Sequence, residues 1–192
     1  MVKLIVSVLL SLSLSTAALA DKLPGNIAIH ITKQHYEHPV RLLHPYLAVW
    51  HMKGPPAEKV ALKALSKQFS NVNMCSQSKE ADVVLLIEPQ MFYNAQLRVF
   101  YAEFIVKAFA NTTQTDNLIP ITAIKMQAQQ NGELSVKPEY YMEKAYTKAM
   151  DKVMKQLLVD KAFLDTLNKT PPNNAEILCT ALDALPISRI YF

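Results

Sequence analysis

The alternation of apolar and polar residues along the chain predicts several β-strands. Residues 26–32 have the two-residue period of a half-buried strand, whereas residues 81–88 are apolar almost throughout, as in a central strand covered on both faces. In all, strands are predicted at residues 26–32, 46–52, 81–88, 96–110 and 119–130. Residues 89–94 predict a turn, and Asn131-Gly132 predicts a tight turn before a short return strand at 133–136.

Two segments carry apolar residues at the three- and four-residue steps of an amphipathic helix. The first follows Gly54-Pro55-Pro56, with Gly54 as the expected cap and Asn71 as the expected stop. The second begins at Lys137-Pro138-Glu139, and its core face runs towards Leu167. The order β-β-α-β-β-β-α predicts an α+β fold, a mostly antiparallel sheet of about five strands with the two helices packed on one face.

Residues 1–20 have the pattern of a cleaved export signal. Lys3 gives a basic start, residues 4–14 are an apolar run, and Ala18-Leu19-Ala20 supplies small residues at the positions that signal peptidase recognises. Cleavage is expected between Ala20 and Asp21, with the mature protein in the periplasm. The residue directly after this point is Asp21 and not the cysteine that carries a lipid anchor, and no later stretch is apolar for long enough to cross a membrane.

Residues 21–168 are expected to form one α+β domain. Residues 169–192 have no periodicity and predict an irregular tail. Ala184-Leu185-Pro186-Ile187 also matches what a common sequencing-adapter oligonucleotide encodes in one reading frame. Two explanations of the tail therefore stay open: an ordinary frayed C-terminus, or residues that are not native.

The composition of the chain excludes several classes of protein function. The chain has 192 residues, 51% of them hydrophobic and 19% charged, which is typical of a globular protein. Its three glycines, Gly25, Gly54 and Gly132, are too far apart for a phosphate-binding loop or a nucleophile elbow. The net charge of +4 is small and the lysines are dispersed, so nucleic acid is not an expected partner.

One face of the last predicted helix carries several lysines. Asp151 lies three residues after one of them and four before another, so it partly neutralises this face. The face is interpreted as solvated, with an anionic partner such as lipid headgroups or a polymer as the alternative. The lysines are Lys144, Lys148, Lys152 and Lys155.

The cysteines and histidines are candidates for cross-linking and metal binding. Cys75 and Cys179 are an even pair that an oxidising compartment would favour as a disulfide, although Cys179 lies in the tail. All five histidines fall in one N-terminal stretch: His30, His35, His38, His44 and His51. His35 and His38, with Glu37 between them, offer donors suited to zinc or copper. Because Pro39 and Pro45 predict a loop here, surface or locally hydrogen-bonded histidines are the favoured interpretation, and neither a metal ligand set nor a cofactor is predicted.

Carboxylates and aromatic residues offer two further possibilities. Glu88 and Glu103 lie on predicted neighbouring strands and are the candidate acid/base pair of a hydrolase, while Glu80 and Asp82 sit at a strand entry. The aromatic residues between Phe92 and Phe109 suit a stacking surface for a polymer, but their alternation is explained more simply by a core face. Tyr93 and Tyr101 are the rings expected to stay exposed.

The layout as a whole resembles small α/β envelope accessory proteins. The features that carry the resemblance are the export signal, the strand Ala81-Asp82-Val83-Val84-Leu85-Leu86-Ile87, the long strands after it, and the final helix with Ala145 and Ala149. The resemblance covers residues 26–158 and is to the periplasmic domains of the curli-secretion-channel family and the penicillin-binding-protein activator lipoproteins. Those families usually carry a lipobox cysteine, which this signal lacks, and no functional residue is carried over from them.

These observations predict an exported, non-catalytic periplasmic protein that binds another envelope component, either a protein or a polymer. The exposed edge of the long strand pair is the expected docking surface, because its unpaired backbone groups can accept another strand. The alternatives are a periplasmic metal or small-ligand binder that uses the histidine stretch, and a hydrolase that uses Glu88 and Glu103. The sequence does not determine the oligomeric state.

Overall fold

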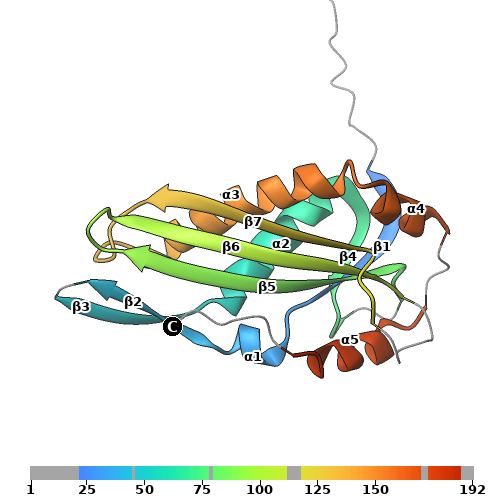
Figure 1. Cartoon of the computed structure of the whole chain (residues 1–192), viewed down its shortest axis with the longest axis horizontal. Helices are drawn as coiled ribbons and strands as arrows, with labels where there is room; N and C mark the ends of the chain where they lie inside the picture. The colour runs from blue at the N-terminus through green and yellow to red at the C-terminus, as the bar shows by residue number, and fades with distance from the viewer. Residues whose placement is uncertain (1–21, 45, 78–79, 112–117, 170–172, 187–192) are drawn as a thin grey trace, which may run out of the picture.

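The computed structural model describes residues 22–44, 46–77, 80–111, 118–169 and 173–186, and its centre is a five-stranded sheet (Figure 1). Its strands lie in the order β4-β1-β5-β6-β7. Their bounds are β1 Leu23–His30, β4 Phe69–Met74, β5 Val83–Asn94, β6 Val99–Ala110 and β7 Thr122–Asn131. The predicted α+β class and the five-stranded sheet are confirmed in this coarse form.

The expectation of a mostly antiparallel sheet was wrong, because the sheet is mixed. β1 runs parallel to both of its neighbours, β4 and β5, while β5, β6 and β7 are antiparallel to one another. The parallel part arises because helix α2 (Gly54–Gln68) returns the chain along the sheet before β4 begins, as a crossover connection requires. The antiparallel part is a meander, in which residues 95–98 connect β5 to β6 and residues 111–121 connect β6 to β7.

A separate two-stranded sheet lies beside β5 (Figure 1). It is a hairpin of β2 (Pro39–His44) and β3 (Leu47–Met52), preceded by the single turn of helix α1 (Lys33–Tyr36). The sequence predicted only the second of these strands and treated the residues before it as a loop. Val40 and Leu42 of β2 are buried in the main core, so one face of the hairpin is fixed to the body of the protein.

Helices α2 and α3 (Pro138–Leu157) pack together on one face of the sheet, which confirms that part of the prediction. Gly54 is the first residue of α2 rather than its cap, which is Lys53. A Cβ atom at Gly54 would lie 2.5 Å from the backbone of Tyr36, so this position requires glycine for the close approach of α1. The last helix does not run on to Leu167, because α3 ends at Leu157 and a separate helix follows, α4 (Lys161–Lys169).

The segment 169–192, expected to be irregular, instead contains helix α5 (Ala175–Asp183). It packs on the sheet face opposite to α2 and α3. Successive residues of a strand point to opposite faces. Leu85 and Ile87 of β5 therefore belong to the main core, whereas Val84 and Leu86 form a second, smaller core with α5. Asn174 caps α5, since its Oδ1 accepts a hydrogen bond from the Glu176 backbone N–H at 2.9 Å.

Three local predictions were also wrong. Residues 89–94 continue β5 rather than turning, the residues directly after α2 form β4 up to Met74, and 133–136 are not a strand. Pro89 is tolerated in the middle of β5 because β1 pairs with β5 only as far as Leu86, so the missing N–H breaks no ladder bond on that side. No helix in the described part of the chain has the length and apolar character needed to cross a bilayer.

Candidate functional site

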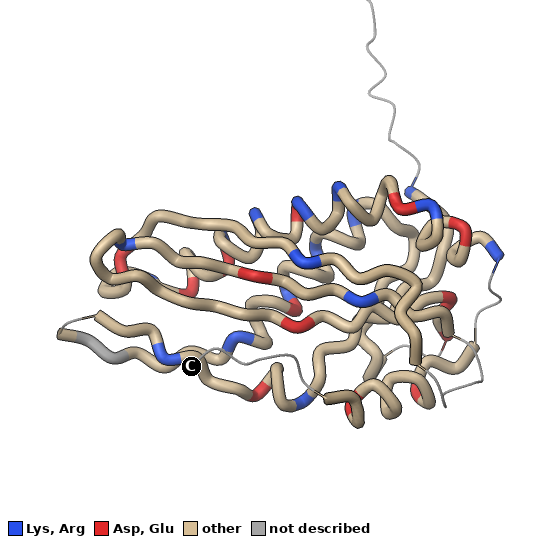
Figure 2. The backbone as a smooth tube through the Cα atoms, in the orientation of Figure 1, with Lys and Arg blue, Asp and Glu red and all other residues tan. Residues whose placement is uncertain are grey.

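The face of β5, β6 and β7 that turns away from α2 and α3 is covered by α5 at one end. Along β5 its residues Glu88 and Gln90 are also buried, and Lys53 Nζ donates to Gln90 Oε1 at 3.3 Å. We call the part of this face beyond α5 the open face. The pairing register sets its residues side by side, with Glu88 opposite Ile105, Gln90 opposite Glu103 and Glu103 opposite Gln127. Figure 2 shows acidic and basic residues interspersed across these strands. The open face consists of Glu88, Gln90, Phe92, Tyr101, Glu103, Ile105, Lys107, Lys125, Gln127 and Gln129.

The two candidate catalytic carboxylates both lie on the open face, but each has its own lysine. Lys107 Nζ lies 3.0 Å from Glu88 Oε1, and Lys125 Nζ lies 3.2 Å from Glu103 Oε1. Glu103 also accepts a hydrogen bond from the Gln127 amide. In the register the two carboxylates are diagonal neighbours rather than directly opposite. This arrangement favours two ion pairs across the sheet over an acid/base pair, which needs one carboxyl group held protonated.

Asp82, one of the two carboxylates at the entry of β5, has a structural role. Asp82 accepts hydrogen bonds from Asn26, at 2.7 Å from the backbone nitrogen and at 3.3 Å from the side-chain amide. These bonds join the entry of β5 to β1. Asp82 is buried, whereas Glu80 is exposed. Neither residue lies on the open face.

A solvent-open hollow of about 720 Å³ lies on the open face near the turn between β5 and β6. Its lining includes Phe92, Tyr101, Glu103, Gln127 and Gln129. The Phe92 side chain is 55% exposed, and its ring centroid lies 5.9 Å from that of Tyr101. The hollow therefore offers a pair of aromatic rings edged by amide and carboxylate groups.

Sequence reasoning was wrong about one of the two rings expected to stay exposed: the exposed ring on β5 is Phe92, one residue before Tyr93. Tyr93 is buried in the main core and only 4% exposed, with its hydroxyl 3.4 Å from the carbonyl oxygen of Gly132. Tyr101 does lie on the open face, as expected. Phe92 was missed because residues 89–94 were predicted to be a turn. Once β5 is extended through this segment, its two-residue period assigns Phe92 to the open face and Tyr93 to the core.

The edge of the sheet at β7 is occupied by lysines of α3. Lys148 Nζ donates to the carbonyl oxygen of Gln129 at 3.2 Å, and Lys152 Nζ donates to that of Gln127 at 2.7 Å. These carbonyl groups would otherwise be available to an added strand. The lysine face predicted to be solvated thus contributes two side chains to the sheet edge, so the open face is a better candidate than this edge for docking.

The five histidines do not converge on one site. Three have separate neighbours, His30 with Asp183, His44 with the backbone of Tyr46, and His51 with Glu139. Among the described residues, the one group of three metal-ligand side chains within 4.8 Å of one another is His30 with Cys75 and Cys179. The expected donors His35, His38 and Glu37 are not in it, and the two cysteine sulfurs are bonded to each other.

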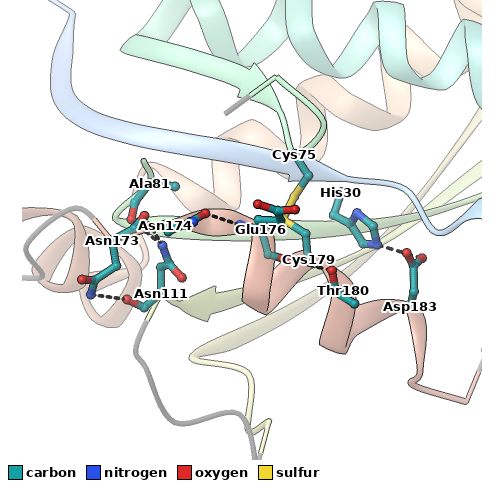
Figure 3. The surroundings of a disulfide bond; sticks show 10 residues. All are labelled: His30, Cys75, Ala81, Asn111, Asn173, Asn174, Glu176, Cys179, Thr180 and Asp183. Carbon is teal, nitrogen blue, oxygen red and sulfur yellow. Dashed lines mark hydrogen bonds and ion pairs between the residues drawn. A yellow bond between two sulfur atoms is a disulfide. The ribbon is translucent and has the colours of Figure 1, made fainter. Parts of the chain in front are cut away.

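Cys75 and Cys179 form a disulfide across a sequence separation of 104 residues, with an S–S distance of 2.00 Å (Figure 3). The bond ties the residue after β4 to α5. Beside it, His30 Nε2 lies 3.1 Å from Asp183 Oδ1. Burial lowers the pKa of His30, and the charge and hydrogen bond of Asp183 oppose that shift. The sequence did not decide whether this disulfide forms, and nothing in the sequence indicated Asp183 as a partner of His30.

A pair of asparagines reinforces the same region (Figure 3). Asn111 Nδ2 donates to the carbonyl oxygens of Ala81 at 2.9 Å and Asn173 at 2.7 Å. Asn173 Nδ2 in turn donates to the carbonyl oxygen of Asn111 at 2.9 Å. The chain that leads into α5 is therefore held to the sheet by hydrogen bonds as well as by the disulfide, which indicates a structural role for this end of the molecule.

Comparison with known proteins shows the fold and no more. No protein-family model matches the chain, and no curated protein matches it. A DUF330-family protein from Xanthomonas campestris has a TM-score of 0.50 at 10% identity, over 72% of this chain and 86% of that one. A minor lipoprotein from Acinetobacter baumannii has a TM-score of 0.39 at 14% identity, over 80% and 99%. The first of these supports the mixed α/β fold, whereas membership of the curli-channel or activator families is not shown.

Proposed function

We propose that this protein is an exported, non-catalytic accessory protein of the bacterial envelope that binds another envelope component at the open face of its sheet. The pattern of residues 1–20 supports export. The disulfide supports it independently, because such bonds persist in oxidising compartments and are rare in the cytosol. Periplasmic location and cleavage after Ala20 belong to the same proposal.

The observation that carries the binding role is the hollow around Phe92. Phe92 is 55% exposed on a strand, and its ring centroid lies 5.9 Å from that of Tyr101. Exposed aromatic side chains of this kind are enriched at binding surfaces. Glu103, Gln127 and Gln129 provide the polar groups that would fix the orientation of a partner. The ion pairs of the open face leave no carboxylate without a lysine neighbour, which favours binding over acid/base chemistry.

The proposal is tested by photo-crosslinking in intact cells. A benzoylphenylalanine residue placed at Phe92 is expected to give a discrete, light-dependent adduct with one envelope component. Ile177 on α5 is the matched control, because its apolar side chain is 60% exposed and lies away from the hollow. The same probe at Ile177 is expected to give no such adduct.

A competition experiment makes the assignment specific to the hollow. Untagged protein in excess should suppress the adduct, whereas the Phe92→Ala variant should compete far less well and Ile177→Ala should compete like the parent. Equal adducts at both positions, or none at Phe92, would overturn the proposal.

A further inference from the structure

The β2–β3 hairpin presents a second exposed surface, formed by other residues than the open face. Its residues alternate, so that Val40 and Leu42 are buried while Arg41 and Leu43 point outward. Across the hairpin Arg41 pairs with Trp50, and Pro39 pairs with Met52. We call the outward side of these strands, with Tyr46 between them, the hairpin surface: Arg41, Leu43, Tyr46, Trp50 and Met52.

The hairpin surface is unusually apolar for an exposed strand pair. The exposed fractions are 51% for Leu43, 89% for Tyr46, 60% for Trp50 and 45% for Met52. Side chains of this size are normally placed inside a protein or at a contact. The hairpin is rigidly seated, because its other face is part of the main core. Its outward face therefore projects large apolar groups from a fixed support.

The one charged residue of the hairpin surface is positive, Arg41. Residues 38–57 contain no aspartate or glutamate, whereas Arg41 lies within the exposed face. The Arg41 guanidinium carbon lies 5.7 Å from the centroid of the Trp50 ring. Arginine pairs well with phosphate oxygens, and tryptophan and tyrosine are enriched where a bilayer meets water. An aromatic and aliphatic face that carries a cation and no acid is complementary to a phospholipid surface.

We infer that the hairpin surface docks on the surface of a phospholipid bilayer. Leu43, Trp50 and Met52 enter the boundary between headgroups and acyl chains, and Arg41 contacts lipid phosphate. A bilayer rich in anionic lipid is preferred, because Arg41 has no acidic neighbour on the hairpin to offset its charge. The contact needs no spanning segment to hold the protein against a membrane, and it leaves the open face to its own partner.

The sequence provides a built-in reporter, since Trp50 is its only tryptophan. The oxidised protein is mixed with vesicles of phosphatidylethanolamine and phosphatidylglycerol, or of phosphatidylcholine alone, and tryptophan emission and co-sedimentation are recorded. The expected result is a blue shift and co-sedimentation with the anionic vesicles and a weaker effect with phosphatidylcholine. Lipids brominated near the headgroup should quench the emission.

Variants separate the hairpin surface from general charge effects. Leu43→Asp should weaken vesicle binding about tenfold or more, because it removes apolar contact and adds repulsion. Arg41→Gln should weaken binding to anionic vesicles about fivefold. Val159→Asp is the matched control, since Val159 is 69% exposed outside the hairpin and the change in charge is the same. This control should bind like the parent.

Several outcomes would overturn the inference. One is no shift and no co-sedimentation with either vesicle type, and another is equal loss of binding in Leu43→Asp and Val159→Asp. A blue shift that appears with rising protein concentration in the absence of lipid would assign the surface to a second copy of the chain instead. None of these results bears on the adduct at Phe92, so failure here is distinguishable from failure of the proposed function.

Discussion

His35 is a fully buried histidine in α1, and neither of its ring nitrogens has a hydrogen-bond partner among the described residues. Burial lowers its pKa to about 4, and the charge of Lys53 acts in the same direction. His38 and Lys107 add smaller shifts of the same sign, whereas Glu88 opposes them. The ring is therefore neutral in the folded protein under conditions where an exposed histidine would begin to take up a proton.

This shift predicts a specific loss of stability in acid. Because the folded pKa of about 4 lies below the ordinary value of 6.5, the unfolded chain binds more protons between these two pH values. The contribution of His35 is fully present above pH 6.5 and is lost as the pH falls towards 4. The loss is on the order of 2–3 kcal/mol in the free energy of unfolding.

The measurement is urea unfolding of the parent and of His35→Leu at neutral pH and in acid. The variant should lose less stability than the parent on acidification, because leucine has no proton to bind. His44→Leu is the control, since His44 is only half-buried on the hairpin, and it should keep the slope of the parent. A His35→Leu variant with the same pH dependence as the parent contradicts the prediction.

Among the elements, α3 has a role beyond covering the sheet, because it protects the edge of β7. Lys148 and Lys152 donate to two carbonyl oxygens of that strand. Exposed edge strands are sites of unwanted strand pairing, and lysines are a common protection. The double variant Lys148→Met/Lys152→Met should therefore self-associate, while its free energy of unfolding changes by less than about 1 kcal/mol.

Light scattering coupled to size exclusion measures this self-association. Lys144→Met/Lys155→Met is the matched control, because it removes the same charge from α3 without touching the two lysines that bond to β7. The control should remain at the size of the parent. Association of both double variants to the same extent would show that lost charge, and not the uncovered edge, is the cause.

The elements also show what a sequence can and cannot reveal. The amphipathic spacing after Gly54 and after Lys137 was enough to locate α2 and α3. The apolar face of a helix is encoded by residues three and four apart, so this signal lies within the segment itself. β4 was missed because Asn71 and Asn73 give it a polar sequence, and its place as a strand depends on pairing with β1, which is far away in the chain. Pro89 is compatible with a strand only because β1 stops pairing beforehand.

The candidate site was predictable in part. The sequence identified Glu88, Glu103 and Tyr101, which do share the open face, but not the lysines that pair with the two carboxylates. Those pairings depend on the register of three strands, which no local pattern encodes. The clustering of histidines along the chain did not become a cluster in space, because His30 of β1 and His51 of β3 contact different partners and His35 is buried in α1.

At the scale of the whole molecule, the disulfide fastens the second face of the sheet. It joins the residue after β4 to α5 across 104 residues, and a long loop closed by a cross-link restricts the unfolded chain strongly. α5 also buries Leu178 and Leu182 against β5. The cross-link therefore adds to packing that exists without it, and its removal should loosen α5 before the rest of the sheet.

Cys75→Ser/Cys179→Ser should lower the free energy of unfolding by about 4 kcal/mol. Hydrogen exchange should rise most in α5 and least in α3, which is held by the main core. A reductant should bring the parent close to the double variant and leave the variant itself unchanged. If the reductant does not alter the parent's melting temperature, the disulfide does not stabilise the fold. Because the cytosol keeps thiols reduced, chain retained there should behave like the variant, which links the stability of α5 to successful export.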